Sequence, residues 1–162
     1  MPPERILLFR SGRHLRAAMD ALGADAPGCA ITVVATPAAV PVLEQIGIDA
    51  DHRIIYDRTP FFRPWPFITS AAGVRALAGR FDRVCVLWND PDGSGQANVD
   101  HTALLVSPRG FTAITADGRL IPHRTGPLLA RELVRAGASL GVAAVLGLCL
   151  FLPARLLRLV RP

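Results

Sequence analysis

The 162-residue sequence contains no lysine, and its positive charge comes from eighteen arginines. Residues 1–123 hold twelve arginines against twelve acidic residues, whereas residues 124–162 hold six arginines against one acid. Because the excess positive charge lies in the C-terminal part, we expect no basic nucleic-acid-binding surface on residues 1–123. A basic C-terminal segment suits contact with anionic phospholipid instead.

Cysteine is also scarce, with three residues at positions 29, 85 and 149. They are odd in number, far apart and set in apolar runs, which favours core packing over disulfides or metal ligation and fits a reducing compartment. The N-terminus has only four apolar residues before Arg10, too few for the core of a signal peptide. We therefore expect residues 1–123 on the cytoplasmic side of a membrane.

Short β-rich apolar runs alternate with segments of helical period, the pattern of a parallel sheet covered by helices. The sequence thus predicts one Rossmann-like α/β domain over residues 1–123, with about five parallel strands. A hairpin at Asp117-Gly118 is expected to lead into Leu120-Ile121. The expected strands are 5–9, 29–35, 52–56, 83–88 and 111–115; the expected helices are 15–22 with a stop at Gly23, 36–47 with a stop at Gly47, 69–80 and 98–106.

The loop after the first expected strand is a candidate anion site. In open α/β sheets, ligands bind at the carboxyl ends of the strands where strand order reverses. Backbone N–H groups and two guanidiniums would meet a phosphate there; an ordinary solvated turn is the alternative. The candidate residues are Arg10, Ser11, Gly12, Arg13 and His14.

The loop after the fourth expected strand is the most polar in the chain. We expect it to shape a pocket for a hydroxyl-rich or phosphorylated ligand, the alternative being a glycine-rich connection that ends in an Asn98 helix cap. It opens like a calcium loop, but His101 stands where a bidentate Glu is required, so we expect no metal. The candidate residues are Asn89, Asp90, Asp92, Gly93 and Gly95.

The segment 56–67 carries five of the ten aromatic residues and three prolines. The prolines predict a loop rather than a helix or a central strand. Aromatic rings with interspersed arginine suit a membrane interface, and the alternative is that they cover one end of the core. The candidate membrane contacts in this segment are Phe61, Phe62, Trp65 and Phe67.

Residues 136–154 form a run of nineteen residues without a charge. As a helix they would extend about 28 Å, close to the hydrocarbon thickness of a bilayer. We expect a basic amphipathic linker helix at 124–135 and a membrane anchor at 136–162, rather than a buried C-terminal helix. Arg155, Arg158 and Arg161 follow the run as further lipid contacts, and both a spanning helix and an in-plane segment after Pro153 fit the pattern.

The chain resembles the N-terminal, acceptor-side half of GT-B glycosyltransferases of the heptosyltransferase type. The resemblance rests on Arg-Ile-Leu-Leu-Phe-Arg-Ser-Gly at 5–12 and Phe-Asp-Arg-Val-Cys-Val-Leu at 81–87, and covers roughly residues 4–121. That family has a catalytic Asp in the loop after its first strand, whereas residues 10–16 contain no carboxylate. The layout is similar to the membrane-anchored subunit of the bipartite GlcNAc transferase of N-glycan assembly.

This resemblance implies a membrane-bound glycosyltransferase-like module for a lipid-linked or cell-envelope acceptor, completed by a partner protein that supplies the nucleotide-sugar site. The polar residues of the first two loops would contact the acceptor or its phosphate. The alternative is a non-catalytic, membrane-tethered scaffold or ligand-binding domain. The sequence assigns no catalytic residue and no cofactor.

Overall fold

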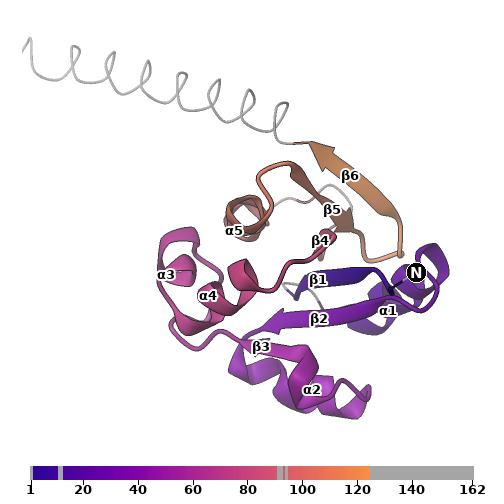
Figure 1. The fold of residues 1–162 in the computed structure, drawn as a ribbon, viewed down its shortest axis with the longest axis horizontal. Helices are drawn as coiled ribbons and strands as arrows, with labels where there is room; N and C mark the ends of the chain where they lie inside the picture. Colours follow the sequence, from indigo (N-terminus) through magenta and orange to yellow (C-terminus); the bar gives the residue numbers. More distant parts are fainter. Residues whose placement is uncertain (1, 11–12, 91–92, 94, 125–162) are drawn as a thin grey trace, which may run out of the picture. The chain divides into compact units, whose positions relative to one another are not determined.

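One mixed sheet organises the computed structural model, which describes residues 2–10, 13–90, 93 and 95–124 (Figure 1). The strands are β1 (Arg5–Arg10), β2 (Ala30–Ala35), β3 (Arg53–Ile55), β4 (Arg83–Leu87), β5 (Gly110–Ile114) and β6 (Leu120–Arg124). The helices are α1 (Leu15–Asp25), α2 (Val40–Gln45), α3 (Pro64–Ile68), α4 (Ala71–Ala78) and α5 (Ala97–Val106), with 3-10 turns at Pro37–Ala39 and Ala50–His52.

The strand order is β3-β2-β1-β4-β5-β6, with parallel pairing from β3 to β5 and an antiparallel β5–β6 hairpin. The predicted Rossmann-like α/β class is confirmed. The sheet has six strands instead of about five because the expected hairpin at Asp117-Gly118 adds β6 to its edge. Gly118 has a φ of 80°, a conformation that the missing side chain makes accessible.

Alternating residues of the central strands bury both faces of the sheet, as expected for parallel strands covered by helices. On one face, Ile6 and Leu8 of β1 share a buried cluster with Leu15 and Leu22 of α1 and with Leu43 of α2. Figure 1 shows α3, α4 and α5 together on one side of the sheet, away from α1. The fold is thus three layers with the sheet in the middle.

Four aromatic rings form the core of the second face. Phe9 of β1 lies 5.6 Å from Phe62 and 5.5 Å from Phe67 between ring centroids, both in edge-to-face geometry. Tyr56 stacks on Phe62 at 5.7 Å, and its hydroxyl bonds to that of Thr59 at 2.9 Å. Such pairs add to the burial of large apolar surface, so this aromatic cluster fixes the segment 56–67 on the sheet.

The prediction of a loop over 56–67 is wrong from Pro64 onward, where α3 begins. Prolines are tolerated in a first helical turn because N–H groups there have no intrahelical acceptor, and both Pro64 and Pro66 lie in that turn. The expected stop at Gly23 is also wrong, since α1 continues to Asp25. Gly23 does not adopt a positive φ, and the chain turns instead at Gly28, whose φ is 76°.

The expectations for the C-terminal part fall largely outside the described residues. Arg124 ends β6, and residues 125–162, including 136–154 and Arg155, Arg158 and Arg161, are not described. Within the described part of the chain, no helix has the length and hydropathy needed to cross a membrane.

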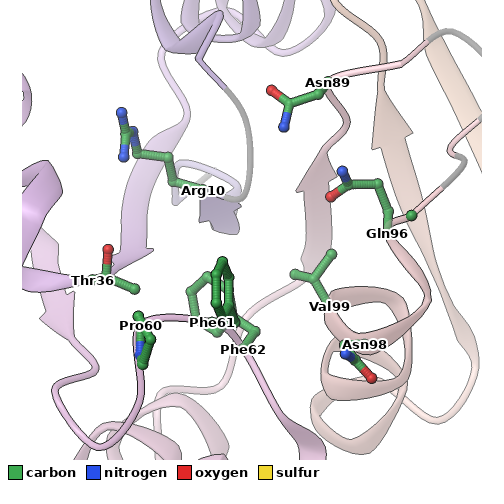
Figure 2. Close-up of a pocket in the computed structure, with 10 residues that line it drawn as sticks. Arg10, Thr36, Pro60, Phe61, Phe62, Asn89, Gln96, Asn98 and Val99 are labelled. Atoms are coloured by element: carbon green, nitrogen blue, oxygen red, sulfur yellow. The ribbon is translucent and has the colours of Figure 1, made fainter.

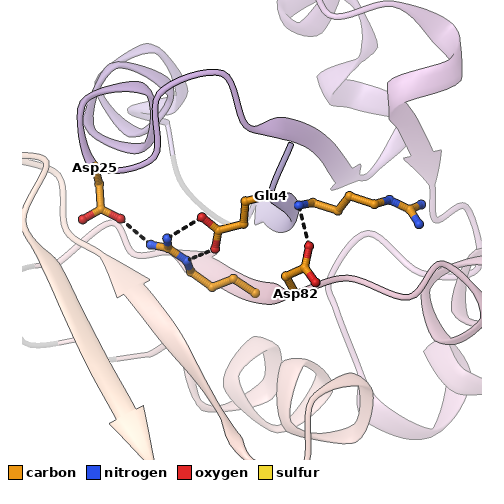
Figure 3. A network of polar contacts seen from close by, with 5 residues as sticks. Glu4, Asp25 and Asp82 are labelled. Carbon is orange, nitrogen blue, oxygen red and sulfur yellow. Dashed lines mark hydrogen bonds and ion pairs between the residues drawn. The ribbon is translucent and has the colours of Figure 1, made fainter. Parts of the chain in front are cut away.

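An ion network joins the amino ends of the central strands (Figure 3). Arg83, the first residue of β4, donates two hydrogen bonds of 2.9 Å to the Glu4 carboxylate and one to Asp25 at the end of α1. The bonds to Glu4 are the main cause that holds the pKa of Arg83 above its usual value. Asp82 accepts the backbone N–H of Arg5 at 2.8 Å. The network therefore links the amino ends of two central strands, β1 and β4, to the end of α1.

We expect Arg83→Gln to lower the free energy of unfolding by about 1–2 kcal/mol, because it removes a bidentate pair that is only partly exposed. Arg16→Gln is the matched control: Arg16 is exposed on α1, and its loss should change stability by less than about 0.5 kcal/mol. Urea unfolding of both variants, followed by circular dichroism, measures the difference. Equal stability of the two variants would contradict a structural role for the network.

Candidate ligand-binding site

A pocket of about 400 Å³ lies at the carboxyl ends of the central strands (Figure 2). The chain builds β1, β2 and β3 outward in one direction and then places β4 on the other side of β1, so strand order reverses between β1 and β4. Connections from these two strands diverge there and leave a crevice, which is where ligands bind in open α/β sheets. Its lining comes from three strand ends, the loops before α3 and α5, and α5 itself: Arg10, Thr36, Pro60, Phe61, Phe62, Asn89, Gly95, Gln96, Asn98 and Val99.

Figure 2 shows Arg10 and Thr36 on one side of this pocket, Asn89, Gln96 and Val99 on the other, and the rings of Phe61 and Phe62 between them. The volume falls within the range of about 300–1,000 Å³ that is typical of small-molecule sites. The lining combines amides, a hydroxyl and one cation with an apolar wall. Such a lining suits a ligand with both polar and apolar parts.

Arg10 is the one charged residue among the described residues that line the pocket. It is the last residue of β1, and its Nε is buried with no hydrogen-bond partner among the described residues. Burial lowers the pKa of Arg10, and no carboxylate among the described residues offsets this effect. Because arginine stays protonated at neutral pH, the pocket holds a partly desolvated positive charge. A bound anion would supply the missing acceptor.

Asn89 connects the two loops that meet at the strand-order reversal. It follows β4, and its Oδ1 accepts the backbone N–H of Arg13, 3.0 Å away in the loop after β1. This bond holds the approach to α1 beside the end of β4. The first turn of α1 has no acidic side chain and no side-chain cap. Its N–H groups therefore contribute positive potential close to Arg10.

Packing around Trp88 shapes the loop between β4 and α5. The indole Nε1 donates to Asp100 Oδ1 at 2.9 Å, which ties the strand end to the first turn of α5. Gly93 covers the indole so closely that a Cβ would lie 2.6 Å from its Cη2, and its φ is 69°. Only glycine suits this position, where the loop closes over Trp88, and Gly93 is not among the residues that line the pocket.

The structure brings together part of the predicted set. Arg10, Asn89 and Gly95 line the pocket, whereas the exposed Arg13, His14 and Asp90 are not among its lining residues. Ser11, Gly12 and Asp92 lie outside the described residues. Of the four aromatic candidates, Phe61 and Trp65 are 70% and 73% exposed, while Phe62 and Phe67 are buried in the aromatic cluster.

The sequence prediction did not assign to the ligand site three polar residues that line the pocket, namely Thr36, Gln96 and Asn98. Thr36 stands at the start of the helix expected over 36–47, but its side chain makes no capping bond and lines the pocket. Gln96 and Asn98 lie at the start of α5, where Asn98 was considered only as a cap. Thr36 directly follows β2, so the rule that nominated Arg10 and Asn89, position just after a parallel strand, also identifies it.

The described cysteines are structural. Cys85 is fully buried in β4, and burial raises the pKa of its thiol to about 12. Burial also raises the pKa of the half-buried Cys29. Both thiols are therefore poor nucleophiles at neutral pH. Among the described residues, no group of three or more His, Cys, Asp or Glu side chains is placed to hold a metal ion.

Comparison with known proteins adds no assignment. No protein-family model matches the chain, and neither the search of curated proteins nor the search of solved structures returned a match. The pocket is therefore the feature of the chain that bears on its function.

Proposed function

We propose that this chain is a ligand-binding Rossmann-like module whose pocket takes an anionic, hydroxyl-rich ligand with an apolar part, such as a phosphorylated lipid-linked or cell-envelope sugar. One observation carries the proposal: a pocket at the strand-order reversal holds a single cation, the half-buried Arg10, whose buried Nε has no hydrogen-bond partner among the described residues, and no carboxylate is among its described lining residues. A partly desolvated charge without a counterion costs stability, and a site that receives its counterion from a ligand accounts for that cost.

Each part of the lining has a role in this proposal. Arg10 donates charge-assisted hydrogen bonds to phosphate oxygens, helped by the N-terminus of α1. Asn89, Gln96 and Thr36 supply donors and acceptors for sugar hydroxyls. The wall of Pro60, Phe61 and Phe62 accommodates the apolar part of the ligand.

The more specific proposal is a glycosyltransferase-like, acceptor-side module that works with a partner. General acid–base catalysis needs a titratable group within about 3 Å of the reacting atoms. The described lining offers neither a carboxylate nor a histidine, so it favours acceptor binding over catalysis by this chain alone. A partner protein would supply the nucleotide-sugar site and the catalytic base. The second candidate, a membrane-tethered scaffold or ligand-binding domain without any transfer reaction, uses the same pocket.

Ligand-dependent thermal stability of the detergent-solubilised full chain tests the binding proposal. We expect glucose 1-phosphate to raise the Tm in a concentration-dependent manner, and glucose or matched sodium chloride to leave it unchanged. Gln96→Ala should weaken the binding about tenfold, whereas Arg16→Gln on the exposed face of α1 should not affect it. A Tm that does not respond to glucose 1-phosphate, or that responds equally to glucose, would refute the proposal.

A transfer assay separates the two candidates. Purified full chain is mixed with nucleotide sugars and lipid extract, with and without the proteins encoded beside its gene. Sugar transfer that requires both this chain and a partner is the result expected for the acceptor-side module. Binding of glucose 1-phosphate with no transfer in any combination would leave the scaffold or ligand-binding domain as the function.

A further inference from the structure

Helices α3 and α4 present apolar side chains to solvent. Phe61, Trp65, Val74 and Leu77 are 70%, 73%, 60% and 50% exposed, and they account for four of the five large hydrophobic residues exposed in the described part. They lie on two adjoining helices and the loop before them (Figure 1). We call these four residues, together with Arg58, Arg63, Arg75 and Arg80, the α3–α4 surface. Single exposed hydrophobic residues are ordinary, but a cluster of large ones indicates a contact.

The outward face of α4 is more apolar than the solvent-exposed face of a surface helix normally is. Its inner face, Ala72, Gly73 and Ala76, is buried against the domain. A surface helix normally carries charged and polar residues opposite its buried face. Here Val74 and Leu77 lie on the outward face, so both sides of α4 are mainly apolar.

The charge of this surface has one sign. Residues 58–81 contain four arginines and no acidic residue, whereas the rest of residues 1–123 contains eight arginines and twelve acids. All four arginines are exposed, and none takes part in an ion pair recorded within the described residues: Arg58, Arg63, Arg75 and Arg80. The neutral total charge of residues 1–123 therefore conceals a basic, apolar region beside an acidic remainder.

We infer that the α3–α4 surface docks on an anionic lipid bilayer. The four guanidiniums are attracted to anionic headgroups, and their apolar stems lie in the interface. Trp65 and Phe61 suit the headgroup level, where one side of a ring is apolar and the other wet. An acidic protein partner would satisfy the arginines but not the apolar area between them, whereas a lipid interface satisfies both.

The orientation that follows connects this surface to the pocket. Phe61 is both a lining residue of the pocket and an exposed residue of the α3–α4 surface. With that surface on a bilayer, the pocket lies beside the headgroups, within reach of a lipid-borne ligand. The docking inference does not depend on the ligand proposed above, since it rests on the exposed side chains of residues 58–81 alone.

Tryptophan fluorescence of the full chain reconstituted with vesicles tests the docking. We expect the emission of Trp65 to shift to the blue, and to be quenched by lipids with brominated acyl chains, when the vesicles contain phosphatidylglycerol but not when they are pure phosphatidylcholine. Trp65→Phe leaves Trp88, which is buried and bonded to Asp100, and should remove the response. Arg63→Gln/Arg75→Gln should reduce the quenching several-fold, whereas Arg16→Gln/Arg109→Gln, with the same change in charge at other exposed sites, should not.

Three results would overturn the inference. Equal quenching in both kinds of vesicle, or none in either, contradicts docking on anionic lipid. Emission that is already blue-shifted in vesicles of pure phosphatidylcholine, with no quenching by brominated lipid, indicates that another part of this chain, such as residues 136–154, covers Trp65. A shift that depends on protein concentration rather than on lipid indicates a second copy. Loss of glucose 1-phosphate binding would leave the docking inference standing.

Discussion

Replacement of Arg10 by methionine is expected to weaken the binding of glucose 1-phosphate about 10- to 100-fold while leaving the unliganded protein as stable as before or more stable. Charge-assisted hydrogen bonds of a guanidinium contribute about 1.5–3 kcal/mol, which sets the loss of affinity. The gain in stability has a separate cause. The Nε of Arg10 is buried without a partner, so an apolar side chain of similar length removes a desolvation cost of about 1 kcal/mol.

Arg13→Met is the matched control for this experiment. Arg13 lies in the same connection after β1, but its side chain is exposed and is not among the residues that line the pocket. Binding to Arg13→Met should be nearly unchanged. Calorimetric titration gives the affinities and thermal unfolding gives the stabilities. If both substitutions weaken binding equally, the anion is attracted by the charge of the loop in general and not by Arg10.

Substitution of Gly73 by alanine should lower the free energy of unfolding by about 3 kcal/mol. Gly73 lies in the first turn of α4, where its N–H donates to the capping Ser70 Oγ at 3.1 Å. A Cβ would lie 2.7 Å from the Cα of Ile68 and would overlap the Phe67 carbonyl oxygen. Both are backbone atoms of α3, so relief of the overlap must move α3 and disturb Phe67 in the aromatic cluster.

Gly23→Ala is the opposite case and serves as the control. Gly23 lies within α1, has no positive φ, and has no atom within 4 Å of the position of an added Cβ. Alanine there should raise stability by about 0.5–1 kcal/mol, because it reduces the freedom of the unfolded chain at no steric cost. Urea unfolding of both variants measures the contrast. A Gly73→Ala protein as stable as the parent would show that α3 does not pack against α4 as described.

Most of the fold was predictable because its strands are buried on both faces. The runs around Leu7 and Val86 are apolar without interruption, and Thr32 is the one polar residue in the run around Val33; few structures other than covered parallel strands produce this pattern. The alternation of such runs with helical segments then determines the order of the elements. The boundaries were less predictable, since Gly23 continues a helix while Pro64 begins one, and tertiary packing decides both.

The candidate site was predictable only in part. A position directly after a parallel strand identifies Arg10 and Asn89, because the carboxyl ends of neighbouring strands meet at one edge. Gln96 and Asn98 reach the same pocket through the geometry of the nine-residue connection between β4 and α5, which sequence spacing does not specify. The burial of Phe62 and Phe67 follows from contacts with Phe9, a residue more than fifty positions away.

The pocket and the α3–α4 surface together suggest an order of recognition. The domain would first bind anionic lipid through the α3–α4 surface. Arg10 would then bind the phosphate of a lipid-borne ligand beside Phe61. Each step depends on different residues: the docking variants should retain the affinity for soluble glucose 1-phosphate, and Arg10→Met should retain the fluorescence response of Trp65.

We expect the half-buried guanidinium of Arg10 to bind the anion, and arginine side-chain NMR tests this most directly. In ¹⁵N-labelled full chain in detergent micelles, the Nε–H signal that Arg10→Met removes belongs to Arg10. We predict that this signal moves when glucose 1-phosphate is added and stays unchanged with glucose, because its Nε–H gains an acceptor. A stationary Arg10 signal while other resonances shift would contradict the claim.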